Sequence, residues 1–149
     1  MKLIKKILIF ILCLPFILII RILKPFVIIQ FCEIRSDRIG YFAMDSIFKI
    51  FFIKKLKKQI IFYYFSSHIS NRQWEKMIKR TIKTYKFTRA LAWVNKKLPG
   101  GNKHEKEVKI NRSRDINGYI YRNNQKTLSF TEEENNYCLN QLTKIGWKR

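Results

Sequence analysis

The sequence predicts an α/β fold with parallel strands, preceded by a hydrophobic amino-terminal helix. Residues 26–32 and Gln59–Phe65 form two short apolar runs rich in β-branched and aromatic side chains, the pattern of strands buried on both faces. A stretch with helical spacing separates them. The order strand, helix, strand is the βαβ unit that begins a doubly wound sheet. A length of 149 residues is room for one compact domain.

The hydrophobic helix comprises residues 1–25, and we expect it to associate with membrane lipid. Lysines within residues 1–6 precede an uninterrupted apolar run, residues 7–20. As a helix this run is about 21 Å long, shorter than the roughly 30 Å hydrocarbon core of a bilayer. Pro15 and the basic flanks favour a helix lying partly in one leaflet, whereas snorkelling basic side chains would let it span. A buried core helix is the structural alternative.

Residues 26–149 are predicted to continue the α/β unit. A polar turn after the first strand leads into a helix over residues 39–58, and a third helix over residues 88–98 ends at the breaker cluster 99–102. Ser70 is placed to cap the helix between them. The apolar residues of that middle helix recur at intervals of three and four: Trp74, Met77, Ile78, Ile82 and Tyr85.

The carboxyl-terminal third is predicted as a loop followed by a helix. Residues 103–127 are polar and without sustained periodicity, with short strands expected at residues 108–110 and 119–121. Residues 131–134 form a capping box, and Gly146 suits the left-handed position that ends a helix. The isolated histidines, His68 and His104, are expected in solvated loops.

Composition limits the classes of function. At 47% hydrophobic and 15% aromatic, the chain has enough apolar surface to order itself. Its three scattered cysteines, Cys13, Cys32 and Cys138, suit neither a disulfide framework nor a metal site. The net charge of +21 attracts nucleic acid, anionic lipid and phosphorylated substrates alike. The lysines are dispersed, as on an ordinary solvated surface, and no nucleic-acid-binding signature is present, so we do not expect nucleic acid as the partner.

The polar segment after the first strand is the candidate functional site. In open α/β sheets ligands bind at the carboxyl ends of strands, where the next helix presents free amides and positive potential. Arg35 and Arg38 add forked donors suited to phosphate or carboxylate. Asp37 between them is suited to accept a proton from a sugar hydroxyl as a general base. The alternative is that Asp37 caps the helix and forms a surface ion pair with Arg35 or Arg38.

Several motifs in the same order resemble a family of bacterial glycosyltransferases. The run IRSDRIG at residues 34–40 is similar to the L-R-S-x-R-I-G-H segment that follows the first strand of that family. Tyr41 stands where the family has histidine. The later matches are Trp74 in a helix, RDING at residues 114–118, FTEEE at residues 130–134 and LTKIG at residues 142–146.

The resemblance implies an enzyme of the GT-B type, similar also to heptosyltransferases, with two Rossmann-like halves. Residues 26–149 would be the incomplete Rossmann-like, acceptor-side half, without the second half and inactive alone. Asp37 matches the catalytic base, and the substrate-binding residues would be Arg35, Ser36, Arg38 and Gly40.

The implied partners are a nucleotide sugar and a glycan or lipid acceptor, at the cytoplasmic face of the bacterial inner membrane. No cofactor and no metal are implied. A different class of function stands beside this one: a small cationic membrane protein that binds anionic lipid or nucleic acid without catalysis.

Overall fold

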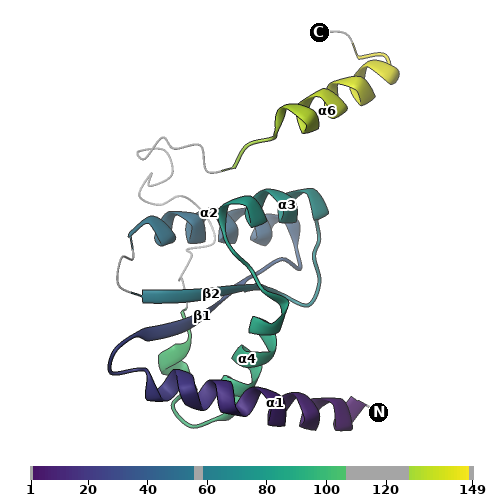
Figure 1. Cartoon of the computed structure of the whole chain (residues 1–149). Helices are drawn as coiled ribbons and strands as arrows, with labels where there is room; N and C mark the ends of the chain where they lie inside the picture. Colours follow the sequence, from purple (N-terminus) through teal and green to yellow (C-terminus); the bar gives the residue numbers. More distant parts are fainter. Residues whose placement is uncertain (1, 56–58, 107–127, 148–149) are drawn as a thin grey trace.

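The structure is a computed structural model that describes residues 2–55, 59–106 and 128–147. It is an α/β unit followed by a helix that stands to one side (Figure 1). The described elements are α1 (Lys2–Ile22), β1 (Ile28–Ile34), α2 (Ile39–Lys55), β2 (Gln59–Phe65), α3 (Arg72–Thr81), α4 (Lys86–Lys97), the short 3₁₀ helix η1 (Gly101–His104) and α6 (Glu132–Lys144).

The two strands pair in parallel, which confirms the α/β class and the βαβ start. Ile28 lies opposite Gln59, and Ile34 lies opposite Phe65. The bounds of β2 are those the sequence predicts, but β1 begins two residues after the predicted start at Phe26 and ends two residues beyond the predicted end at Cys32. The reason is tertiary: Ile34 is fully buried and pairs with the last residue of β2, so the chain stays extended through it.

Isolated parallel bridges lie on both sides of this strand pair. Glu105 bridges to Phe31 of β1, and Thr84 bridges to Tyr63 of β2. Thr84, β2, β1 and Glu105 therefore lie side by side in that order. If the two bridging residues mark the places of further strands, this is the strand order 3-2-1-4 of a doubly wound sheet. The arrangement is compatible with an incomplete Rossmann-like fold.

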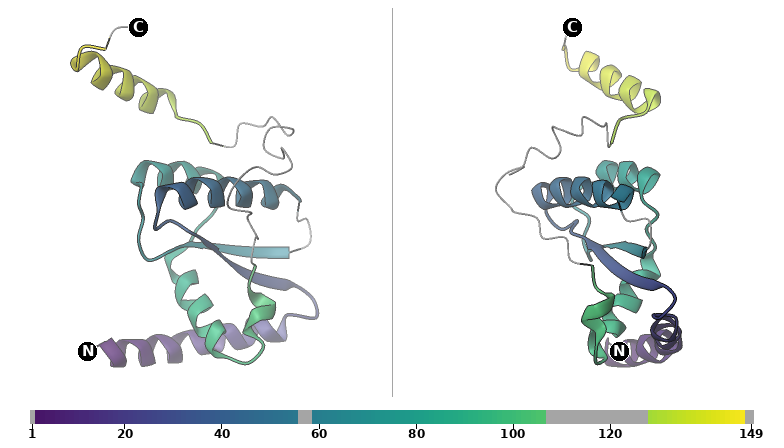
Figure 2. Two further views of the ribbon diagram at one scale, coloured as in Figure 1. Left: turned by 180° about the vertical axis from the view of Figure 1, so that it is seen from behind. Right: turned by 90° about the vertical axis from the view of Figure 1, so that its left-hand side faces the viewer.

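Helices cover both faces of the sheet (Figures 1 and 2). Because strand side chains alternate, Phe31 of β1 faces α1 and α4, whereas Cys32 faces α2 and α3. The buried residues on the first face are Ile17, Ile20, Ile29, Phe31, Tyr64, Ala92 and Val94. Those on the second face are Cys32, Ile34, Phe42, Ile50, Tyr63, Ile78 and Ile82.

The helix α3 is shorter than its apolar pattern predicts. Its cap is Asn71, whose side chain accepts a hydrogen bond from the amide of Trp74 at 2.8 Å, so the predicted cap Ser70 is wrong. It ends at Thr81, because the chain beyond it becomes extended to place Thr84 beside β2. Tyr85, expected in the same helix, instead precedes α4.

The helix α1 is one layer of the α/β unit. Phe10, Cys13, Ile17 and Ile20 recur at three- and four-residue intervals and pack toward the sheet and α4. No helix among the described residues is long and apolar enough to cross a membrane.

His104 corrects another expectation, because it is buried and not solvated. Its ring Nδ1 lies 2.8 Å from the carbonyl oxygen of Ile29, and only 2% of the residue is exposed. The short helix η1 places His104 there, beside the edge of β1 that does not pair with β2. His68 is exposed, as expected.

The carboxyl-terminal expectations are confirmed where the structure describes them. The Thr131 hydroxyl accepts from the amide of Glu134 and the Glu134 carboxylate accepts from the amide of Thr131, which completes the capping box. Gly146 has a φ of 86° and follows the end of α6. The strands expected at residues 108–110 and 119–121 lie outside the described residues.

Burial of Cys32 leads to a test of the fold. Burial raises the pKa of this thiol to about 11, whereas Cys138 is exposed on α6. A raised pKa keeps the thiol protonated and unreactive until the pH approaches that value. We expect a thiol reagent at pH 8 to modify Cys138 quickly and Cys32 only after unfolding, as followed by mass spectrometry. A Cys138→Ser variant is the control, and rapid modification of Cys32 in the folded chain would contradict this packing.

Candidate functional site

The turn between β1 and α2 presents its charged side chains to solvent. The first hydrogen bond of α2 runs from the amide of Phe42 to the carbonyl of Arg38 at 2.8 Å, so Arg38 occupies the cap position. Asp37 precedes it. Within the described part of the chain, Asp37 takes part in no ion pair, so the alternative of a surface pair with Arg35 or Arg38 is not what the structure has. Arg35, Asp37 and Arg38 are exposed.

Ser36 is the buried residue of this turn. Its hydroxyl donates to the carbonyl of His68 at 2.6 Å, and its own carbonyl accepts from the amide of Ser70 at 2.8 Å. Its amide donates to the hydroxyl of Ser66 at 3.4 Å. These bonds tie the turn after β1 to the turn after β2. The side chain of Ser36 therefore supports the site from beneath, while Gly40 lies exposed in the first turn of α2.

An open hollow of about 400 Å³ lies at the carboxyl ends of the two strands. It brings together three residues that the sequence singled out, Arg35, Asp37 and Arg38. Gly40 is not among the described residues that line it. The other lining residues are Glu33, Tyr41, Ser66 and Ser67.

Sequence reasoning missed Glu33, Ser66 and Ser67 as site residues. Glu33 belongs to β1, and its Oε1 accepts a hydrogen bond from the hydroxyl of Ser66 at 2.8 Å. Two signals were present in the sequence: a carboxylate at the end of an apolar strand, and two hydroxyl residues directly after the second strand. Both lie at the carboxyl ends of parallel strands, where ligand sites form.

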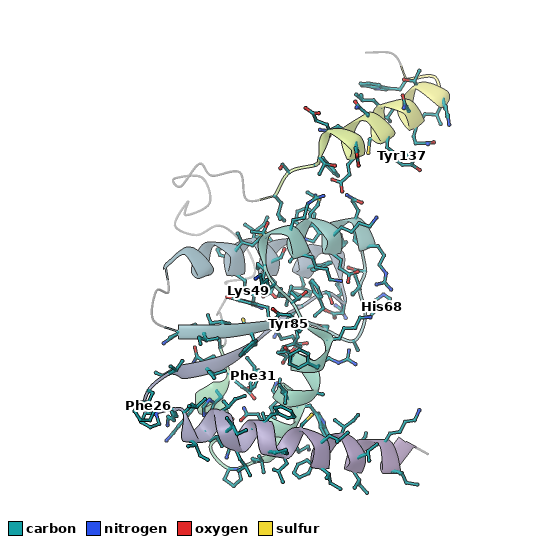
Figure 3. All side chains as sticks on the ribbon, in the orientation of Figure 1. Phe26, Phe31, Lys49, His68, Tyr85 and Tyr137 are labelled. Atoms are coloured by element: carbon teal, nitrogen blue, oxygen red, sulfur yellow. The ribbon has the colours of Figure 1, made fainter. Side chains whose placement is uncertain are left out.

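A buried ion pair supports the turn from below. The carboxylate of Asp45 pairs with Lys49 one helical turn later, and their side chains are only 8% and 5% exposed. The same Asp45 oxygen accepts from the amide of Arg35 at 2.8 Å, and Lys49 also donates to the carbonyl of Glu33. Figure 3 shows Lys49 between α2 and the sheet. The pair therefore fixes the backbone between Glu33 and Arg35.

Trp74, which carries part of the resemblance, has a packing role in the structure. Its indole N–H donates to the hydroxyl of Ser46 on α2 at 3.0 Å, and this bond holds α3 against α2. The FTEEE motif leads into α6, whose Glu134 forms an ion pair with Arg80 of α3. The RDING motif at residues 114–118 lies outside the described residues.

The hollow is polar, and its lining carries two arginines and two carboxylates. Arginine side chains offer forked donors, the exposed Ser67 offers a hydroxyl, and the exposed Asp37 carboxylate offers a proton acceptor. Among the residues that the structure describes, no group of His, Cys, Asp or Glu could hold a metal ion.

Comparison with known protein families, with curated proteins and with solved structures gave no match to this chain.

The buried pair beneath the turn gives a stability test. An Asp45→Ala variant would leave Lys49 buried without its partner, and we expect it to lose about 3–5 kcal/mol of unfolding free energy. A double variant, Asp45→Ala with Lys49→Met, removes both charges and should lose clearly less. Urea unfolding followed by circular dichroism measures both. Equal losses in the two variants would show that the pair does not act as described.

Proposed function

We propose that this chain carries the acceptor side of a membrane-associated glycosyltransferase of the GT-B type. The observation that carries the proposal is the exposed Asp37 carboxylate between Arg35 and Arg38, at the mouth of a hollow at the carboxyl ends of parallel strands. The order of the motifs in the sequence supports the same class.

Asp37 would act as the general base. A sugar hydroxyl is a weak nucleophile until a base takes its proton during attack on the anomeric carbon of a nucleotide sugar. The bond between the hydroxyl oxygen and the anomeric carbon forms as the bond between that carbon and the nucleoside diphosphate breaks. Asp37 is exposed and holds no ion-pair partner among the described residues, so its oxygens are available to receive that proton.

Arg35 and Arg38 would hold anionic groups of the acceptor or the donor. Their guanidinium groups form charge-assisted, forked hydrogen bonds with phosphate and carboxylate. Glu33 is the second carboxylate of the hollow, but its Oε1 already holds the hydroxyl of Ser66. We therefore assign Glu33 to positioning Ser66 and the base to Asp37.

Sugar transfer needs a donor and an acceptor held together, which is most of what such an enzyme contributes to the rate. This chain would hold the acceptor, and a second Rossmann-like half would hold the nucleotide sugar. By itself the 149-residue chain should bind acceptor-like anions and transfer nothing.

The second candidate is a cationic membrane protein that binds anionic lipid without catalysis. The largely exposed apolar surface of α1 and the net charge of +21 favour it. This candidate needs no particular role for Asp37 or for the arginines beside it, because a dispersed field attracts anions from every side.

Binding of a sugar phosphate distinguishes a specific site at Arg35 and Arg38 from general attraction by the positive charge of the whole chain. We expect Arg35→Gln with Arg38→Gln to weaken binding at least about tenfold, since each charge-assisted bond contributes roughly 1.5–3 kcal/mol. The matched control is Lys76→Gln with Lys83→Gln, which removes the same charge from exposed positions on and just after α3. Isothermal titration calorimetry at two salt concentrations measures both. Equal weakening in the two double variants would contradict the site.

The role of Asp37 is tested by Asp37→Asn. Removing this negative charge should leave sugar-phosphate binding equal or tighter, because a repulsion is lost. With a donor-binding half supplied, the same change should lower transfer by about 10²–10⁴-fold, the usual contribution of a general base. Full transfer by the Asn variant would contradict the assignment. Transfer from a nucleotide sugar by the unaided chain would contradict the division into halves.

A further inference from the structure

The outward face of α1 is apolar and uncovered within the described structure. One side of the helix packs on α4 and the sheet, through residues such as Ile17 and Ile20. The opposite side projects away from the sheet (Figure 3). Its side chains are each more than half exposed: Ile4, Leu8, Leu12, Phe16, Ile19 and Ile22.

No charged side chain lies on the outward face along the middle of α1. Arg21 is the single charged residue between Ile7 and Leu23, and it is turned into the protein. Its guanidinium donates to the carbonyl of Pro99 at 2.7 Å and to Oδ1 of Asn95 at 3.3 Å, at the end of α4 where a helix favours a cation. The outward face is therefore free of charge over about 21 Å, from Leu8 to Ile22.

Basic residues stand at both ends of this apolar stretch. Lys5 and Lys6 are exposed at one end, and Lys24 is exposed at the other. Phe26, which is 85% exposed, follows Lys24 and lies at the same end of α1 (Figure 3). Apolar side chains framed by lysines complement a bilayer whose headgroups are anionic and whose acyl chains begin just below them.

A spanning helix would require α1 to leave the fold. Ile17 is fully buried and Ile20 is 9% exposed, so withdrawing the helix would expose the core beneath it and break the bonds of Arg21. A helix lying in the membrane plane keeps those contacts and still removes its outward face from water, at a depth of about 5–10 Å.

We propose that α1 stays in the folded unit and lies in the plane of an anionic bilayer, with its outward face inserted in one leaflet. The inference rests on the membrane-association part of the proposed function and is independent of sugar transfer. The helices α1 and α4 both lie on the face of the sheet opposite α2 and α3 (Figures 1 and 2), whereas the hollow lies at the carboxyl ends of the strands. A lipid-linked acceptor would reach it from the side.

Flotation with vesicles tests the insertion of this face. The full chain should bind phosphatidylcholine vesicles containing phosphatidylglycerol much more strongly than vesicles of phosphatidylcholine alone. Leu12→Glu should weaken that binding at least about tenfold, because a leucine that inserts among the acyl chains is replaced by a charge. The matched control is Phe87→Glu on α4, since Phe87 is 58% exposed and Leu12 is 60% exposed. Equal loss in both variants, or no loss in Leu12→Glu, would overturn the proposal.

Orientation is tested with tryptophan at three outward positions. Ile4→Trp, Leu12→Trp and Ile22→Trp are compared in vesicles of lipids brominated at different acyl depths, each as the change from the unsubstituted chain. A helix in the membrane plane gives the same shallow depth at all three positions. A depth that is greatest at Leu12 and shallow at both ends would show a spanning helix and overturn the proposal.

A second copy of the chain is the other occupant that such a face could take. Sedimentation without lipid should show a monomer. A dimer that Leu12→Glu dissociates, together with absent vesicle binding, would overturn the membrane proposal and assign the face to self-association. Asp37→Asn should leave vesicle binding unchanged, so a failure of the sugar-transfer proposal and a failure of the membrane proposal give different results.

Discussion

Parallel pairing of β1 with β2 is the interaction on which the rest of the structure depends. A parallel pair needs a crossover connection and cover on both faces, because its strands are apolar throughout. The helix α2 makes the crossover and covers one face with α3, while α1 and α4 cover the other. The same pairing brings the two carboxyl ends together, so the turn that contains Ser36 meets the turn that contains Ser66. The hollow exists because of this meeting.

The site contains buried residues that fix the backbone of the turn and exposed residues that are available to a ligand. Ser36, Asp45 and Lys49 are buried, and their hydrogen bonds fix the backbone of the turn. Asp37 and Arg38 are exposed on that fixed backbone. Preorganisation of this kind is what a ligand site requires, since groups that are already placed lose little entropy on binding. The helix α1 also has two roles, because one side completes the core and the other side is exposed and available to a membrane.

Local pattern predicted the parts of the fold that local forces decide, and tertiary pairing decided the rest. The bounds of β2 and the capping box of α6 follow from side chains close in sequence. The end of β1 at Ile34 and the end of α3 before Thr84 depend on partners more than twenty residues away. Arg35 and Asp37 were visible as a motif, whereas Asp45 and Lys49 enter the site only through the packing of α2. The uniform apolar run of α1 gave no sign of which side would pack.

One measurement tests directly whether the strand pair builds a single anion site: titration of the nitrogen-15-labelled chain with pyrophosphate, followed by amide chemical shifts. We expect the shifts to concentrate in two segments far apart in sequence, residues 35–41 and residues 66–67, with a common saturation curve. Shifts spread over the exposed lysines, such as Lys76 and Lys83, with no concentration at the two turns, would contradict it.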